Sequence, residues 1–411
     1  MKTITMKMIY TILFFVLLLV YLLSYLLPAK DTQYVYSDDV LRETALSRNM
    51  KSIPSRYEDL LKLHEVNASV LSKEKVALGR ELYFEPLLSQ SKSVSCSTCH
   101  MLSQKPHDKE RYVKALLNTP HNPRSDCRIC HEKDESGTDR LATAVNFNEQ
   151  KHPLHLNTLT TLNAALAQYQ TWDASLLSVE EEIRASLIDS FEMNISVKIL
   201  EKRLFENREY LEKFEMAFNE KGEKAVSVDN VVLALGAYLR TLVTRSAYDE
   251  FLDGNNSAMS QKAKNGMANF INFGCKGCHT GITVGGQTIQ KFPVRDYNSI
   301  IDITNTFNEV ARGREVGTLG LNISMRHKFP FENIGGFMGM NEEQLFRVPI
   351  LRNVTKTSPY FHNGEIQDIR EAVYIMAKHQ LGMNLSNEQI DEIVAFLKAL
   401  EGEIVEYEEL K

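Results

Sequence analysis

The chain has 411 residues, which is enough for two or three domains with a sizeable core. Its formal net charge is −6, with acidic and basic residues mixed along the sequence and no polybasic run. This pattern gives no reason to expect nucleic-acid binding.

The N-terminal segment contains a long run without a charged residue, Met8–Leu27, preceded by Lys2 and Lys7. That length is sufficient for one helix to cross a bilayer, and the two lysines favour a cytoplasmic N-terminus. The run is longer than a usual cleavable signal, and no small-residue cleavage pattern follows it. We therefore predict a signal-anchor transmembrane helix over residues 1–30. A cleaved signal, the alternative, would also place the rest of the chain outside the cytoplasm.

Residues 31–65 form a predicted polar linker, and the chain after them is predicted to be mostly helical. Apolar residues recur at helical spacing in Asn230–Val243 and Asn387–Leu400. No convincing series of alternating strands is present. The expected fold class is all-α, with few or no strands.

The six cysteines form three C-x-x-C-H motifs. They are CSTCH (Cys96, Cys99, His100), CRICH (Cys127, Cys130, His131) and CKGCH (Cys275, Cys278, His279). This motif is the attachment signature of c-type haem, in which two thioethers hold one porphyrin and the adjacent histidine is the proximal iron ligand. The sequence therefore predicts three covalently bound haem c groups.

Two other interpretations of these cysteines are less consistent with the sequence. The first two C-x-x-C pairs are separated by a stretch of chain that a zinc site could use. A C-x-x-C pair can also be a dithiol redox motif, but that motif is expected beside a βαβ unit. Neither alternative explains why a histidine follows all three pairs.

From about residue 75 to 402 the chain resembles the bacterial dihaem cytochrome c peroxidase family. The resemblance rests on Ala77–His100 around the first motif, and on Asn272–Gln287, Phe346–Asn353 and Ser358–Met376 around and after the last one. It implies two cytochrome c-like haem domains, a peroxidatic one over residues 66–244 and an electron-transfer one over 245–403, with a tail at 404–411. The extra haem lies in an insertion over about residues 101–150.

The resemblance also implies roles for individual residues. Met376 follows His362 at the family's spacing and corresponds to the methionine ligand of the high-potential haem. Trp172 follows Asn157 at the family's spacing and corresponds to a tryptophan between the haems. Glu192 corresponds to the family's acid–base glutamate. A calcium site is implied at the Asn157 side chain and the carbonyl groups of Thr357 and Pro359, since Ca²⁺ takes oxygen ligands.

Two positions depart from the family pattern. Glu182, ten residues before Glu192, stands where the family often has glutamine. The family's W-D-G-R is Trp172-Asp173-Ala174-Ser175 here, so the arginine is missing. A second carboxylate and a lost cation both change the electric field around a bound peroxide, so we include Glu182 with Glu192 and Trp172 as catalytic candidates.

The sequence leaves open which of the first two haems is peroxidatic. The residues before CSTCH match the family, which favours His100. However, the separation of His131 from Asn157 is close to the family's normal spacing, whereas His100 lies much further before Asn157. The distal ligands are also open. The candidates are His107, His121, His152 and His155.

The functional expectation is a cytochrome c peroxidase that reduces hydrogen peroxide with electrons from a small cytochrome c or a quinol-linked donor. The alternatives are a membrane-tethered electron-transfer cytochrome, or a dihaem oxidase of a protein or organic substrate. Such oxidases typically carry tyrosine at the position of Met376. The expected location is the bacterial inner membrane, single-pass, with the catalytic part in the periplasm. Dimers are common in the family, and a homodimer is compatible with the resemblance.

Overall fold

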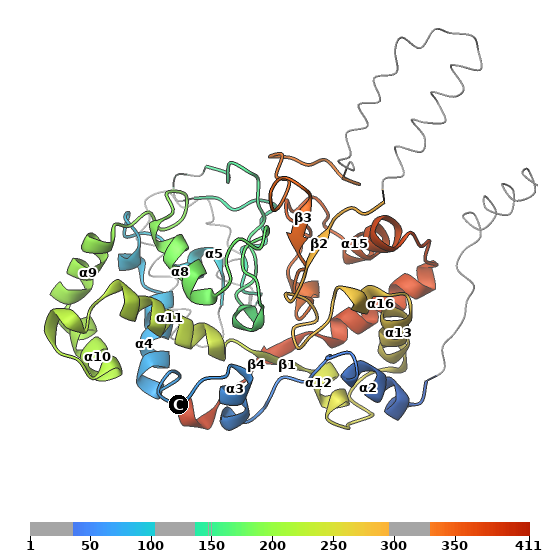
Figure 1. Cartoon of the computed structure of the whole chain (residues 1–411), viewed down its shortest axis with the longest axis horizontal. Helices are drawn as coiled ribbons and strands as arrows, with labels where there is room; N and C mark the ends of the chain where they lie inside the picture. Colours follow the sequence, from blue (N-terminus) through green and yellow to red (C-terminus); the bar gives the residue numbers. More distant parts are fainter. Residues whose placement is uncertain (1–35, 103–135, 147, 149, 296–328) are drawn as a thin grey trace, which may run out of the picture.

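The computed structural model describes residues 36–102, 136–146, 148, 150–295 and 329–411. These residues form two helical lobes that meet along the middle of the molecule (Figure 1). Several sequence-based expectations concern residues outside this described part of the chain: the run Met8–Leu27, the motif Cys127, Cys130 and His131, and the candidate ligands His107 and His121.

The first lobe is built around two helices, α4 (Lys73–Tyr83) and α11 (Val228–Thr241). Ser72 and Ser227 cap their N-termini, each accepting a hydrogen bond from a backbone N–H of the first turn. A Cβ atom on Gly79 would lie 1.8 Å from the Ala234 carbonyl oxygen, so only glycine allows the two helices to approach so closely. Other helices of this lobe include α5 (Cys96–Cys99), α8 (Val179–Ile188), α9 (Val197–Glu206) and α10 (Arg208–Phe218).

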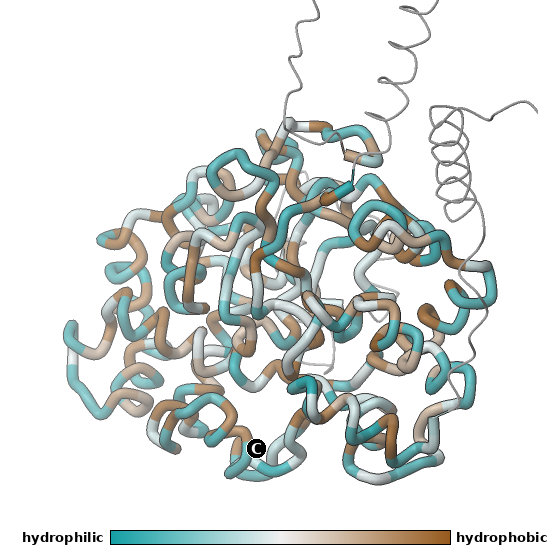
Figure 2. The backbone as a smooth tube through the Cα atoms, turned by 45° about the vertical axis from the view of Figure 1, so that its right-hand side comes forward, coloured by the Kyte–Doolittle hydropathy of each residue, from teal (hydrophilic) through white to brown (hydrophobic). Residues whose placement is uncertain are grey.

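The second lobe is built around α13 (Gln261–Asn272) and α16 (Asn387–Ala399). Here a Cβ atom on Gly266 would lie 1.8 Å from the Glu392 carbonyl oxygen, so a glycine again sets the distance between two helices. Around this pair lie α2 (Asp38–Leu46), α12 (Ala247–Leu252) and α15 (Ile369–Ile375). Hydrophobic and hydrophilic stretches alternate along the chain in both lobes, as amphipathic helices require (Figure 2).

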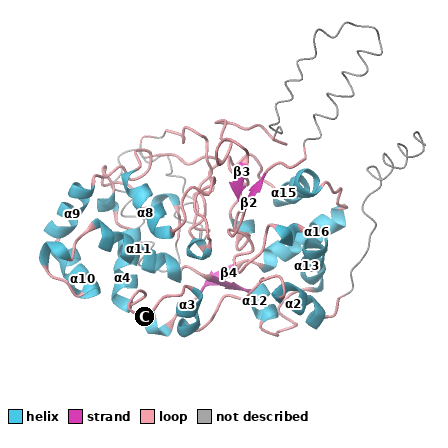
Figure 3. Ribbon diagram, viewed as in Figure 1, coloured by secondary structure: helices cyan, strands magenta, loops and turns pink. Residues whose placement is uncertain are grey.

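Four short strands form two antiparallel pairs in the described part of the chain (Figure 3). Strand β1 (Thr244–Ser246) pairs with β4 (Gly402–Ile404), and β2 (Ile289–Lys291) pairs with β3 (Leu345–Arg347). The mainly helical fold agrees with the prediction. Of the two helices named from the sequence, one begins and ends two residues earlier, as α11, and the other ends one residue earlier, as α16.

Near each end of the described chain, residues pack in the core of the lobe that is more distant in the sequence. Leu41, Ala45 and Met50 pack in the core of the second lobe, although the first lobe follows them in sequence. Tyr407, near the C-terminus, packs in the core of the first lobe, and its hydroxyl donates to the Pro54 carbonyl at 2.9 Å. The predicted linker, residues 31–65, thus contains two helices, α2 and α3 (Tyr57–Leu63). The predicted limits of the two haem domains, 66–244 and 245–403, stay a prediction.

Within the described ranges, no helix combines the length and apolar character that crossing a bilayer requires. The longest described helix, α11, has 14 residues. It therefore spans only about 21 Å, against a hydrocarbon core of roughly 30 Å. This finding contradicts the predicted single-pass inner-membrane localisation with a periplasmic catalytic part. The run Met8–Leu27, on which that prediction rested, lies outside the described residues.

Candidate haem sites

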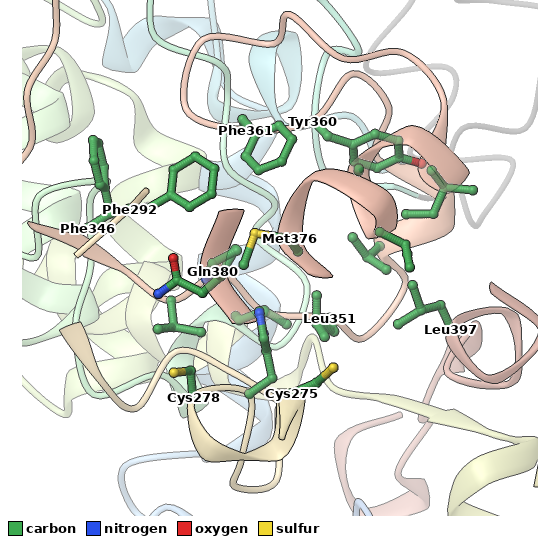
Figure 4. Close-up of a pocket in the computed structure, with 18 of the residues that line it drawn as sticks. Cys275, Cys278, Phe292, Phe346, Leu351, Tyr360, Phe361, Met376, Gln380 and Leu397 are labelled. Carbon is green, nitrogen blue, oxygen red and sulfur yellow. The ribbon is translucent and has the colours of Figure 1, made fainter. Parts of the chain in front are cut away.

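The second lobe contains a cavity of about 230 Å³ lined mainly by apolar side chains. One water needs only about 10–15 Å³, and protein cores are otherwise close-packed, so this space fits a much larger apolar group. Cys275 and Cys278 lie on one side of the cavity, and Met376 lies across from them (Figure 4). Phe292, Phe346 and other aromatic and aliphatic side chains form the walls.

The CKGCH motif is folded into a single turn at this cavity. Gly274 adopts a left-handed conformation (φ 101°) after α13, and a 3₁₀ turn follows at Cys275–Gly277. The His279 N–H donates to the Cys275 carbonyl at 3.0 Å, which places the histidine one turn from the first cysteine. The spacing of the motif therefore brings two thiols and an imidazole to one wall.

His279 is buried and lines the cavity. Burial lowers the pKa of its ring to about 4, although the backbone groups of Val284 and Pro349 oppose this shift. The ring is therefore neutral near pH 7, the form that can bind a metal. This chemistry and the cavity fit a covalently attached haem held by Cys275, Cys278 and His279.

Met376 is the first residue of a π-helical turn, Met376–Leu381, that continues α15. Such turns are rare and often occur at functional sites, because the extra residue changes the direction of the side chains. Here the turn begins at the residue whose thioether projects into the cavity opposite the cysteines (Figure 4). The position of Met376 is compatible with its predicted role as a haem ligand, which stays a prediction.

The first motif, CSTCH, forms α5 in the other lobe, with Ser95 as its N-cap. The His100 Nδ1 lies 3.2 Å from the Gly137 carbonyl oxygen, a contact that orients the ring. The Tyr83 hydroxyl donates to the His100 carbonyl at 2.6 Å. Burial raises the pKa of the Cys96 thiol to about 12, with contributions from the charges of Cys99 and Glu192.

Glu192 lies in a tight turn after α8. The Asn194 N–H closes the turn on the Asp189 carbonyl at 2.9 Å, and the Met193 carbonyl accepts from the Gln90 N–H at 2.8 Å. The second bond ties the turn to the segment that leads into CSTCH. The Glu192 side chain is accessible to solvent, yet enough protein surrounds it that desolvation raises the pKa of its carboxyl group, against a hydrogen bond from Ser186.

Glu182, on α8, is the second carboxyl group of this region. Burial, followed by the negative charge of Glu192, raises its pKa to about 7. Its Oε2 atom is buried and has no hydrogen-bond partner. A carboxyl group with this pKa exchanges its proton near neutral pH.

Trp172 lies between the lobes. Its Nε1 donates to the Asn157 carbonyl at 2.8 Å, its own carbonyl accepts from the Arg347 N–H at 2.9 Å, and its ring lines the second-lobe cavity. Asn157 is tied to the second lobe as well, since its N–H donates to the His362 carbonyl at 2.7 Å.

Asn157, Thr357 and Pro359, predicted as calcium ligands, line the same cavity. The Asn157 amide nitrogen donates to the Leu141 carbonyl at 2.7 Å. No group of three or more His, Cys, Asp or Glu side chains that could hold a metal occurs in the described part of the chain. The calcium site therefore remains a prediction that rests on an amide and two carbonyl groups.

Of the candidate distal ligands, His152 and His155 are described. The His152 ring packs against Phe191 at 4.8 Å between centroids, which places it beside the turn that carries Glu192. Burial lowers the pKa of this ring. His155 adopts a left-handed backbone conformation (φ 51°). The structure thus places His152 beside the turn that carries Glu192, and its role as a distal ligand stays a prediction.

Arg347 and His362 are not among the predicted site residues, although both line the cavity. His362 is buried among phenylalanine rings, its Nε2 lies 2.8 Å from Asn333 Oδ1, and burial lowers its pKa to about 3. Both residues lie inside the segments FRVPILRN and SPYFHNGEIQDIREAVYIM, which are similar to the family as whole segments. The similarity of these two segments to the family is the sequence signal that could have identified Arg347 and His362 as site residues.

In the described part of the chain, two C-x-x-C-H turns lie in different lobes, which is the arrangement expected of a cytochrome with more than one c-type haem. Residues 73–125 and 117–257 match the family model described as di-haem cytochrome c peroxidase. The chain is 30% identical over 365 residues to cytochrome c551 peroxidase of Pseudomonas aeruginosa, covering 89% of this chain and 87% of that protein. The chain belongs to the dihaem cytochrome c peroxidase family.

Other relatives agree with this assignment. Cytochrome c551 peroxidase of Nitrosomonas europaea is 29% identical over 328 residues, 79% of each chain. The methylamine utilization protein MauG of Methylorubrum extorquens is 26% identical over 371 residues, 87% of each chain. A crystal structure of a MauG-like protein associated with microbial copper homeostasis shares the fold, with a TM-score of 0.60 at 19% identity, covering 83% of this chain and 93% of that one.

Proposed function

We propose that this protein is a cytochrome c peroxidase that catalyses H2O2 + 2 e⁻ + 2 H⁺ → 2 H2O. The observation that carries the proposal is Glu192, a carboxyl group with a raised pKa in a turn that is hydrogen-bonded to the segment leading into CSTCH. Relatives named cytochrome c551 peroxidase, similar over most of the chain, support the same activity. A carboxyl group that gains and loses a proton is what cleavage of a peroxide needs, because one proton must move between the two oxygen atoms.

Covalently attached haem would supply the redox chemistry, carrying the electrons that the donor delivers. The side chains of the chain then have separate roles. His100 and His279 would each hold a haem iron, and Met376 would be a second ligand to the second-lobe haem, giving it a high reduction potential. Glu192 moves the proton at the peroxidatic site, and Glu182 is a second carboxyl group within its electrostatic reach.

Trp172 is the proposed connection between the two centres. Its ring lines the second-lobe cavity, and its segment leads within ten residues to Glu182 on α8. An aromatic ring in this place provides a path of bonded and closely packed atoms between two haem groups. The electron donor in this proposal is a small cytochrome c or a quinol-linked protein, and it delivers electrons to the haem of His279 and Met376.

The remaining motif, with Cys127, Cys130 and His131, carries a third haem in this proposal. It serves as an added relay or entry haem, while His100 holds the peroxidatic one. A pyridine haemochrome assay of the purified protein should give three haem groups per chain, and the Cys127→Ser/Cys130→Ser variant should give two. A wild-type count of two would remove the third haem from the proposal without affecting the rest.

Replacing Glu192 tests the mechanism. Glu192→Gln keeps the size of the side chain but cannot exchange a proton, and it should lower the steady-state rate of peroxide consumption by about 10²–10⁴-fold. Glu220→Gln is the matched control, since Glu220 is an exposed glutamate after α10. A Glu192→Gln protein that is fully loaded with haem and consumes peroxide at the wild-type rate would refute the role of this residue.

Met376 separates the proposal from the oxidase alternative, because the resemblance places tyrosine there in such oxidases. Spectra of the protein after peroxide addition, without reductant, distinguish the two. The peroxidase proposal expects no long-lived high-valent state under these conditions.

A further inference from the structure

The π-helical turn Met376–Leu381 is bonded to the end of β2 and to the residues after it. The Gln380 amide nitrogen donates to the Lys291 carbonyl at 2.9 Å, and the Arg295 N–H donates to the His379 carbonyl at 2.9 Å. The segment from Lys291 to Arg295 is thus joined to the turn at two successive residues. Because π-helical turns are rare, we expect contacts from outside the helix to hold this one in place.

The end of the turn packs against the same segment. Gly382 follows the turn in a left-handed conformation (φ 73°), and a Cβ atom there would lie 2.5 Å from the Arg295 Nε atom. The Arg295 side chain therefore lies directly against the residue that ends the turn. Phe292, inside this segment, is a wall of the haem cavity, so the turn is held against part of the cavity wall.

Gln380 differs from these backbone contacts because its bond comes from a side chain that lines the haem cavity. It lies four residues after Met376, close to one turn of helix, so the two side chains project from the same face. Both line the cavity (Figure 4). A displacement of Gln380 is therefore passed within one turn to the thioether of Met376.

The amide oxygen of Gln380 is buried and has no hydrogen-bond partner. A buried polar atom that lacks a partner costs free energy, because it has lost its contact with water without compensation. An apolar side chain would fill the same space without this cost. The amide at this position is therefore explained by its N–H group, which is the part that bonds to Lys291.

We propose that Gln380 is a positioning residue that acts through Met376: its hydrogen bond to the Lys291 carbonyl holds the π-helical turn against the end of β2 and keeps the thioether directed into the cavity. The inference rests on the proposed function, in which Met376 is a ligand of the second-lobe haem. Without this bond the turn moves more easily, and a competing ligand displaces the thioether more easily.

The test is displacement of Met376 by imidazole in the oxidised, haem-loaded protein. It is followed at the absorption band of sulfur-to-iron charge transfer, which reports a thioether bound to ferric haem. Gln380→Leu removes the N–H donor and keeps a similar side-chain volume. It should lower the imidazole concentration that removes half of the band by about 2–10-fold, the effect expected from one net hydrogen bond.

Gln261→Leu is the matched control in the same lobe. The Gln261 side chain also donates a hydrogen bond, to Asn265 Oδ1 at 2.9 Å, but it lies exposed on α13 and outside the cavity lining. This variant should leave the imidazole midpoint unchanged. Gln380→Glu keeps the shape of the side chain but has no N–H donor at neutral pH, so its midpoint should fall as in Gln380→Leu.

A Gln380→Leu protein with the wild-type imidazole midpoint overturns the inference. If Gln380→Leu yields no haem-loaded protein, Gln380→Glu is measured in its place, with the same two outcomes. Failure of both variants to fold, beside a folded Gln261→Leu, also overturns the inference, because a role limited to Met376 leaves the fold and haem attachment intact.

The imidazole titration does not depend on turnover, so the inference and the proposed function fail separately. A wild-type protein without the sulfur-to-iron band overturns Met376 as a ligand, and this inference with it. A wild-type protein that shows the band but consumes no peroxide overturns the proposed peroxidase activity, while the titration still decides the role of Gln380.

Discussion

Breaking the buried ion pair between Arg352 and Asp249 should be one of the most destabilising single changes in the second lobe. Both side chains are fully buried, and they are joined by two hydrogen bonds of 2.8 and 2.9 Å. Arg352 also donates to the carbonyl groups of Ile282, near the CKGCH turn, and Lys51. Asp249 accepts from the Ile53 N–H at 2.7 Å. The pair thus joins α12, the haem-attachment loop and the N-terminal segment.

Replacing Arg352 by methionine removes the cation and leaves Asp249 buried without a counter-charge. Such a change typically costs about 3–5 kcal/mol in the free energy of unfolding, because the desolvated carboxylate is no longer compensated. The measurement is denaturant unfolding of the haem-loaded protein at pH 7. Arg208→Met is the control, since Arg208 and Glu212 form an exposed pair on α10 that should contribute less than about 1 kcal/mol.

The effect should also depend on pH. Burial would raise the pKa of Asp249, but the charge and hydrogen bonds of Arg352 hold it below its ordinary value of 3.8. A carboxyl group with a lowered folded-state pKa stabilises the protein above its unfolded-state pKa, and this stabilisation is lost as the pH falls through the folded-state pKa. The difference between wild type and Arg352→Met should therefore shrink below about pH 4. A difference under about 1 kcal/mol at pH 7, or one that grows in acid, would refute this reasoning.

Two further changes probe the haem site and the helix packing. Met376→Leu removes the thioether and keeps a similar side-chain volume. The second-lobe haem should therefore lose its high reduction potential, while haem attachment at Cys275 and Cys278 is retained. Spectroelectrochemical titration measures the potential, and an unchanged value would exclude Met376 as a ligand. Gly266→Ala places a methyl group 1.8 Å from the Glu392 carbonyl oxygen, so α13 and α16 must separate. The expected loss is about 1–3 kcal/mol in the free energy of unfolding, and equal stability of the variant would contradict the close approach.

Much of the fold could be predicted from the sequence because it depends on local pattern. The apolar spacing of residues 230–243 and 387–400 predicted two helices that the structure contains with shifts of one or two residues. The shifts reflect the caps: Ser227 starts α11 two residues earlier than the apolar pattern indicated. The roles of α2 and of the C-terminal tail were not predictable, because Leu41 and Tyr407 pack against residues far away in the sequence.

The sequence by itself determined the haem-attachment chemistry, because two cysteines and a histidine within one short motif are brought together by one turn of backbone, whatever surrounds them. Only the tertiary structure decided which charges meet in the core. Arg352 and Asp249 are 103 residues apart in the sequence, and they form a buried ion pair only because the fold brings α12 beside the segment that carries Arg352. The electric field at a site depends on distances in space between buried charges, and spacing along the chain does not contain that information.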